Sequence, residues 1–349
     1  MKDYSSFEKP FDTRKEQRNE KKFYQKKDRS KFKKTDQAKE EAPKTPENCR
    51  HGRVITISTG AISVQIGDEI IPSSLKGSLK QEITRDKNLV TVGDFVWIDD
   101  RGQIAAIDKR HSCLSRADTL HQRKQQIIAA NIDQVLIVSS VENPSLKPSL
   151  IDRYIIATER GGMQPIIVIN KIDLIKDFAF IDELEAIYTK LGIPFLKVSA
   201  LHETGLDALK TIITGKASVF SGQSGVGKTS LVNDLTGLNR KVGGIVHKTK
   251  KGSHTTTHAE LIPIKGDTFC IDTPGIKSFA LWDITQEELT AYFSDLQEFA
   301  TQCKYNPCSH THEPECAVKT AVAEGHLSPI RYNSYITILE CHDQDHTTR

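Results

Sequence analysis

The segment from Gly222 to Ser230 reads GQSGVGKTS, and it decides what kind of fold this chain can adopt. Its Gly-x4-Gly-Lys-Thr pattern is typical of a phosphate-binding loop, in which backbone N–H groups surround the phosphates of a nucleotide. The preceding ASVFS indicates a buried strand, and KTSLVNDLTG indicates a helix whose N-terminus attracts anions. All nine residues are therefore expected to contact nucleotide: Gly222, Gln223, Ser224, Gly225, Val226, Gly227, Lys228, Thr229 and Ser230.

Two of these residues have further expected roles. Lys228 is a candidate catalytic residue, because its ammonium can neutralise the β- and γ-phosphates. The Thr229 hydroxyl is expected to bind Mg²⁺.

Downstream, CIDTPG predicts a strand that ends at an acidic residue. Asp272 can hold Mg²⁺ through water, and the backbone N–H of Gly275 can meet the γ-phosphate. The polar stretch between the two motifs, KTKKGSHTTTHAELIPI, contains the threonine expected to complete the Mg²⁺ shell. Thr256 is the preferred candidate, with Thr255 and Thr257 as alternatives.

Upstream of the phosphate loop, IIVINKID indicates a buried strand followed by a segment that reads a nucleotide base. The Asp173 carboxylate can accept hydrogen bonds from N1–H and the N2 amine of guanine, a donor pair that adenine lacks. Asn170 and the stem of Lys171 complete this segment. VSA, with Ser199 and Ala200, is typical of a second base-contacting loop. The sequence thus predicts selectivity for GTP over ATP.

The order of these segments is unusual, because the base-reading segment normally follows the phosphate loop. The same sheet can still be assembled if the chain is cut and rejoined elsewhere, since the termini of compact domains often lie close together. Strands alternate with helices here, which predicts a mostly parallel, doubly wound sheet. Residues 116–284 are therefore predicted to form an α/β domain that resembles the circularly permuted P-loop GTPases.

The N-terminal part contains two regions that differ in composition and in hydrophobic pattern. Residues 1–48 are polar, and residues 9–34 hold twelve Lys or Arg against four Asp or Glu, which predicts a disordered basic tail able to contact RNA. Residues 49–115 contain short alternating strands between Gly and Asp turns, which favours a small closed barrel such as an OB-fold. Such barrels often bind nucleic acid, although a purely structural barrel is the alternative. RHSCLSRADT, residues 110–119, is expected to be a linker.

Residues 285–349 are predicted to form a helical zinc-binding module. TQEELTAYFSDLQEFA and PIRYNSYITILECHDQ are expected helices, with a cysteine-rich segment between them. Cys303, Cys308, His310 and Cys316 provide three thiolates and an imidazole, a set that suits a closed, structural, tetrahedral Zn²⁺ site. His312 competes with His310 as the fourth ligand.

The 349 residues are 37% hydrophobic and 27% charged, which suits a multidomain globular chain. No apolar run is long enough to cross a bilayer, and the first residues carry no signal-peptide pattern. We expect a cytoplasmic protein with no membrane partner, and nothing in the sequence requires more than a monomer.

A barrel, a permuted GTPase with GQSGVGKTS, NKID, VSA, HTTT and DTPG, and then CxxxxCxHxxEPxC resemble one family. It is the bacterial ribosome small subunit-dependent GTPase, a factor in late maturation of the 30S subunit. The resemblance covers roughly residues 50–340. It implies hydrolysis of GTP to GDP and phosphate, stimulated by the small subunit, contact with 16S rRNA and one bound zinc. Mg²⁺ would accompany GTP.

One position departs from the usual GTPase pattern. Many GTPases carry a Gln just after the DTPG glycine to orient the attacking water, but here that residue is Ile276. Intrinsic hydrolysis should therefore be slow. His254, beside the threonines of HTTT, is the candidate residue for positioning the water.

Two other functions are compatible with parts of the pattern. A phosphate-loop enzyme that uses ATP, such as a small-molecule kinase, leaves Asp173 without a role. An RNA-binding scaffold with a degenerate nucleotide site is disfavoured by the intact Lys228, Thr229 and Asp272.

Overall fold

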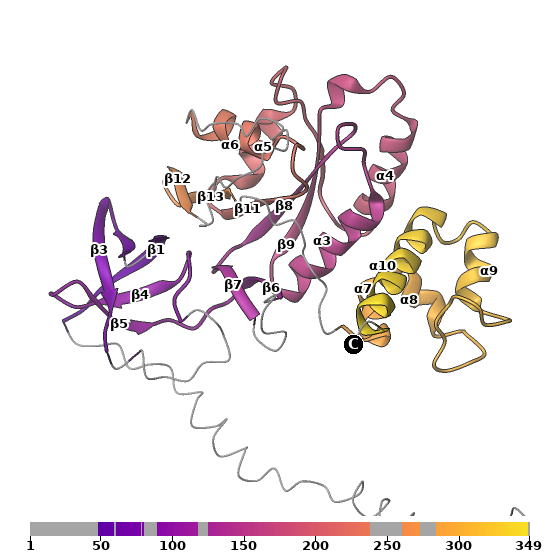
Figure 1. Cartoon of the computed structure of the whole chain (residues 1–349). Helices are drawn as coiled ribbons and strands as arrows, with labels where there is room; N and C mark the ends of the chain where they lie inside the picture. Colours follow the sequence, from indigo (N-terminus) through magenta and orange to yellow (C-terminus); the bar gives the residue numbers. More distant parts are fainter. Residues whose placement is uncertain are drawn as a thin grey trace, which may run out of the picture. The chain divides into compact units, whose positions relative to one another are not determined.

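The structure is a computed structural model, shown in Figure 1, and it describes residues 48–58, 61–77, 79, 89–117, 125–237, 260–272 and 284–347. The chain divides into two units, Met1–Lys44 and Thr45–Arg349. Everything below concerns the second unit. The predicted basic tail lies almost entirely outside the described residues, and the predicted domain boundaries stay predictions.

The predicted barrel is confirmed, and it is closed. Its strands neighbour one another in the order β1-β2-β3-β5-β4, and β4 pairs back to β1. Inward-facing residues alternate along the strands, and Val54, Val64, Val96 and Ile104 are buried inside. This architecture fits an OB-fold. The strands are β1 (Arg50–Ser58), β2 (Ala61–Ile66), β3 (Glu69–Leu75), β4 (Phe95–Ile98) and β5 (Gln103–Ile107).

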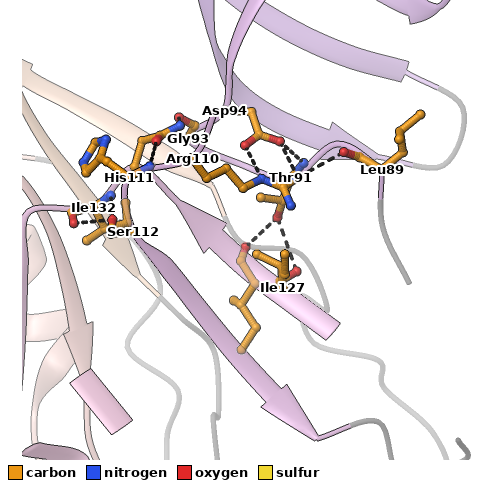
Figure 2. Close-up of polar contacts among 11 residues, drawn as sticks. Leu89, Thr91, Gly93, Asp94, Arg110, His111, Ser112, Ile127 and Ile132 are labelled. Carbon is orange, nitrogen blue, oxygen red and sulfur yellow. Dashed lines mark hydrogen bonds and ion pairs between the residues drawn. The ribbon is translucent and has the colours of Figure 1, made fainter. Parts of the chain in front are cut away.

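The prediction of a linker over residues 110–119 is wrong in part. Residues Cys113–Ala117 form β6, which pairs antiparallel with β7 (Gln125–Ala130). This hairpin is attached to the barrel by the polar contacts in Figure 2. Arg110 binds both carboxylate oxygens of Asp94, at 2.7 and 2.8 Å, and the Thr91 hydroxyl donates to the Ile128 carbonyl at 3.1 Å. The segment is therefore ordered by contacts distant in sequence, which no local pattern reveals.

The α/β part is built on one sheet, as predicted. Its strand order is β10-β9-β8-β11-β13-β12, parallel throughout except for β12 at one edge. Hydrophobic runs such as QVLIVSS and QPIIVIN are buried on both faces, as expected of a parallel sheet covered by helices. The strands are β8 (Gln134–Ser140), β9 (Gln164–Asn170), β10 (Phe195–Lys197), β11 (Ala217–Ser221), β12 (Leu261–Lys265) and β13 (Thr268–Asp272).

Helices cover the two faces of this sheet in pairs (Figure 1). One face packs against α3 (Pro148–Arg160) and α4 (Ala179–Lys190), and the other against α5 (Leu206–Ile213) and α6 (Lys228–Thr236). The alternation of strands with helices was predicted, and α6 is the helix expected from KTSLVNDLTG. The chain runs outward from β8 to β10 and then returns to β11 on the other side of β8. The strand order therefore reverses between β8 and β11, and ligands of such sheets bind beyond the strand ends at that point.

The C-terminal helices differ from the prediction in two ways. The expected single helix over residues 285–300 is two helices, α7 (Gln286–Tyr292) and α8 (Ser294–Ala300). They are separated at Phe293, whose ψ of 75° is not helical and whose ring is fully buried in the core of this module. A further helix, α9 (Ala317–Ala323), follows the cysteine-rich segment. Burial of Phe293 outweighs the helical propensity of the surrounding residues. The predicted last helix is α10 (Pro329–Thr347).

A buried ion network joins α10 to the α/β part. The Arg331 side chain is 5% exposed and binds Asp152 of α3, whose side chain is 1% exposed. Its guanidinium also donates to both carboxylate oxygens of Asp295 in α8, at 2.9 and 3.0 Å. The Tyr188 hydroxyl donates to Asp152 at 3.0 Å. Burial raises the pKa of Asp152, and the charge of Arg331 opposes that rise.

Replacing Arg331 by Met should destabilise the fold by about 3–5 kcal/mol, because two carboxylates would lose their cation and Asp152 is fully buried. Thermal unfolding and hydrogen exchange of α3 and α10 measure the effect. The control is Lys304→Met, which removes a surface ion pair with Glu315 at 2.7 Å and should cost less than about 1 kcal/mol. Equal losses in the two variants would contradict the prediction.

Candidate nucleotide site and metal centre

The predicted phosphate loop connects β11 to α6, at the point where the strand order reverses. Its glycines are required by close contacts. Gly222 has φ 148°, and a Cβ there would lie 2.0 Å from the carbonyl oxygen of Val138. Gly227 has φ 96°, and a Cβ there would lie 2.3 Å from Nδ2 of Asn170. The loop can therefore bring its backbone N–H groups close to phosphates and pack against two neighbouring strands.

Lys228 begins α6 and is 9% exposed. Its ammonium donates to the carbonyl oxygens of Gly222 and Gln223, at 2.9 and 2.8 Å. The positive charge is thus held over the phosphate loop, where anions would lie. Thr229 is the next residue of the helix.

Asn170 is the residue that connects the predicted parts of the site. It ends β9 and is 2% exposed. Its Nδ2 donates to the carbonyl of Val226 in the phosphate loop at 2.9 Å, and its Oδ1 accepts from the backbone N–H of Ala200 at 3.2 Å. One side chain therefore sets the distance between the phosphate loop and the second base loop.

Asp173 lies in a short 3-10 turn, Ile172–Leu174, directly after β9. Its side chain is exposed, and its Oδ1 accepts a hydrogen bond of 2.5 Å from the hydroxyl of the buried Ser199. The Ser199 hydroxyl itself accepts from the backbone N–H of His202 at 3.3 Å. Because a carboxylate carries no hydrogen to donate, the Ser199 hydroxyl is the donor, and it orients the Asp173 carboxylate.

Lys171 has a left-handed backbone, with φ 64° and ψ 36°. Its ammonium donates to the carbonyl oxygens of Asn143 and Glu142 in the turn after β8. No motif covers that turn, and its role was missed in the sequence. The signal that could have found it is an Asn-Pro pair three residues after the end of a central buried strand.

The magnesium and water-positioning predictions depend on residues that the structure only partly describes. Asp272 ends β13, paired in parallel register with Phe220, so its backbone lies at the same sheet edge as the phosphate loop. The residues outside the described part of the chain are His254, Thr255, Thr256, Thr257, Gly275 and Ile276. Their roles stay predictions.

The cysteine-rich segment forms one compact cluster. The ligand atoms of Cys303, Cys308, His310 and Cys316 all lie within 4.8 Å of one another. The Sγ atoms of Cys303 and Cys316 are 3.8 Å apart, and each is 3.5 Å from Nδ1 of His310. A tetrahedral Zn²⁺ with usual bond lengths requires S···S of about 3.7 Å and S···N of about 3.5 Å. The donor set and its dimensions therefore fit zinc.

Neighbouring helices support this cluster. Tyr332 of α10 donates to the His310 carbonyl at 2.8 Å, and Gln286 of α7 donates to the Cys308 carbonyl at 3.0 Å. Burial, and then the adjacent thiols, raise the pKa of Cys308 to about 12, so a cation is needed to bring this thiol to the thiolate form at neutral pH. His312, the alternative ligand, lies outside the cluster and contacts Thr311 at 2.9 Å.

Comparison with known proteins agrees with this geometry. A model of the RsgA GTPase family matches residues 107–282. The small ribosomal subunit biogenesis GTPase RsgA of Flavobacterium johnsoniae is 36% identical over 304 residues, which cover 83% of this chain and 93% of that protein. The protein of the same name from Bacteroides fragilis is 37% identical over 279 residues, covering 78% and 90%.

Two solved structures are also similar. YjeQ from Thermotoga maritima superposes with a TM-score of 0.67 at 31% identity, covering 84% of this chain and 98% of YjeQ. YloQ, described as a circularly permuted GTPase, has a TM-score of 0.63 at 31% identity, covering 85% and 96%. Among the residues that the structure describes, none of the helices combines the length and the apolar character needed to cross a bilayer.

The unusual order of the base-reading segment and the phosphate loop is therefore a circular permutation, and the chain belongs to the RsgA GTPase family.

Proposed function

We propose that this GTPase binds the small ribosomal subunit and hydrolyses GTP to GDP and phosphate during late 30S maturation, with its activity stimulated by the subunit. The observation that carries the proposal is the double contact of Asn170, which joins the base-reading segment to the phosphate loop in one site. The relatives' name, small ribosomal subunit biogenesis GTPase, supports the choice of partner.

In this proposal each described residue has a chemical task. Asp173 accepts hydrogen bonds from guanine, Lys171 lies along the base, and Ser199 and Ala200 form the second base loop. Residues Gly222 to Ser230 bind the phosphates, Lys228 neutralises charge as the reaction proceeds, and Thr229 binds Mg²⁺.

The remaining tasks fall on the HTTT and DTPG segments. Thr256 and Asp272 would complete the Mg²⁺ shell, and the N–H of Gly275 would meet the γ-phosphate. Since Ile276 cannot hydrogen-bond water, His254 would position the attacking water when the protein is bound to the subunit. When bound, Mg²⁺ supplies charge neutralisation at the β- and γ-phosphates.

The remaining parts would provide contacts to the subunit. The barrel of residues 49–115 and the basic tail of residues 1–48 suit contact with 16S rRNA, and the module of residues 285–349 would hold one structural zinc through Cys303, Cys308, His310 and Cys316. We further propose that the α/β domain spans residues 116–284 and that the protein acts as a cytoplasmic monomer.

GTP hydrolysis by the purified protein should be slow alone and strongly stimulated by isolated small ribosomal subunits. Hydrolysis of ATP should not be stimulated by the subunits. Phosphate release measured with each nucleotide, with and without subunits, tests this. In the same assay, His254→Ala should lose the stimulation while still binding GTP, because only water positioning is removed. Fast hydrolysis without subunits, or equal use of ATP, would overturn the proposal.

A further inference from the structure

The chain leaves β8 in a short turn, residues 141–146, that is closed by a buried hydroxyl. Ser140, the last residue of β8, is 1% exposed, and its Oγ donates to the carbonyl of Pro144 at 2.7 Å. The backbone N–H of Leu146 donates to the carbonyl of Val141 at 3.4 Å. Because Pro144 has no N–H to donate, this turn has one backbone hydrogen bond fewer available to it. The Ser140 hydroxyl therefore has an important part in holding its shape.

This turn is attached to the base-reading segment. The backbone N–H of Val141 donates to the carbonyl of Asn170 at 3.3 Å. The Lys171 ammonium donates to the carbonyl of Asn143 and, at 3.4 Å, to that of Glu142. Hydrogen bonds from an ammonium are stronger than neutral ones. The turn thus offers two oxygen atoms to the charged end of a lysine expected to lie along the base.

The same turn borders the phosphate loop. A Cβ on Gly225 would lie 3.8 Å from Cδ of Pro144 and 3.9 Å from the carbonyl oxygen of Asn143. β8 and β11, which lead into the turn and the phosphate loop, are the two strands between which the strand order reverses. The turn therefore lies at the nucleotide crevice, beside both the base-reading and the phosphate-binding segments.

We infer that Ser140 is a positioning residue for guanine nucleotide binding, and that it acts through Lys171. Its hydroxyl holds the turn so that the carbonyls of Glu142 and Asn143 fix the lysine ammonium. A free lysine side chain loses rotamer entropy when it is ordered, and ordering it before the nucleotide arrives raises affinity. The inference rests on the proposed nucleotide site.

The test is the Ser140→Ala variant, measured with fluorescently labelled GDP and GTP. Affinity should fall about three- to tenfold, the loss expected for one hydrogen bond, and KM for GTP should rise more than kcat falls. Ser140→Thr, which keeps the hydroxyl, should restore most of the affinity. The matched control is Ser139→Ala, because that half-buried neighbour makes no side-chain hydrogen bond to another residue the structure describes. It should bind like the wild type.

The decisive measurement repeats Ser140→Ala in a Lys171→Met background. If Ser140 acts through the lysine, the second substitution should cause no further loss of affinity. An equal loss in both backgrounds, or no loss in the single variant, overturns the inference and leaves the proposed function intact. A wild-type protein that binds no guanine nucleotide would instead overturn the proposed function itself.

Discussion

The Asp173→Asn variant should bind xanthosine triphosphate more tightly than GTP, reversing the base preference of the protein. In the proposed site the carboxylate accepts from N1–H and the N2 amine of guanine, whereas an amide would present a donor where the second acceptor was. One charge-assisted hydrogen bond is replaced by a contact between two donors and the other loses its charge, so affinity for GTP should fall by roughly 100-fold or more. Xanthine carries an oxygen in place of the N2 amine and matches the new donor.

The structure indicates which way the new amide will face. The Ser199 hydroxyl donates to Oδ1 of Asp173 at 2.5 Å while it accepts from the N–H of His202. An amide oxygen keeps that hydrogen bond, whereas an amide NH₂ group in its place would meet a second donor. Oδ1 of the asparagine should therefore stay at Ser199, leaving the NH₂ group toward the 2-position of the base.

Competition binding of GTP, XTP and ATP to the wild type and the variant measures this reversal. Adding Ser199→Ala to the variant should weaken the preference for XTP, because the amide is then free to flip. The control is Asp177→Asn, since Asp177 accepts from the backbone N–H of Ala179 at 3.0 Å and contacts neither Ser199 nor Asn170. A variant that still prefers GTP would show that Asp173 does not read the base.

Removing the metal should unfold the C-terminal module while the α/β part still binds nucleotide. Cys303, Cys308 and Cys316 are part of the hydrophobic core that also contains Phe293 and Tyr335. The segment between α8 and α9 contains no regular helix or strand, so its shape depends on the cluster. Structural zinc contributes about 10–16 kcal/mol to the folding of small zinc modules, which is more than most domains have in reserve.

The Cys316→Ala variant, or the wild type treated with a chelator, should lose the unfolding transition of the C-terminal helices. Hydrogen exchange over α7 to α10 locates the loss, and elemental analysis should give one zinc per wild-type chain and none in the variant. His310→Ala should behave in the same way and His312→Ala should not, because only His310 lies in the cluster.

The matched control is Cys341→Ala, since Cys341 is exposed and far from the cluster in sequence. It should keep both zinc and stability. Unchanged protection of α7 to α10 in the zinc-free Cys316→Ala variant would show that the module folds without the metal.

Most of the α/β part could be predicted because its signals are local. Buried strands such as QVLIVSS and QPIIVIN are continuous apolar runs, and α3, α4 and α5 have an amphipathic period. The hairpin of β6 and β7 lacked such signals. It depends on contacts distant in sequence, such as the hydrogen bond from the Thr91 hydroxyl to the Ile128 carbonyl.

In the candidate site, too, some features could be predicted from the sequence and others depended on the tertiary structure. The sequence alone determined which residues could read guanine, bind phosphates and bind zinc, because each task demands particular chemical groups at particular spacings. It left His310 and His312 as alternatives, since both lie within reach of the cysteines along the chain. The tertiary structure favours His310, whose Nδ1 is 3.5 Å from two thiols, while His312 bonds to Thr311.

Only the tertiary structure could reveal how the separate motifs act together. Asn170 joins two loops, Ser199 orients Asp173, and Ser140 shapes the turn that holds Lys171. These hydrogen bonds connect residues up to 56 positions apart in the chain, as between Asn170 and Val226. Local sequence specifies which groups are available, but their pairing depends on strand order, which is decided when β8, β9 and β11 pack side by side and bury their apolar faces.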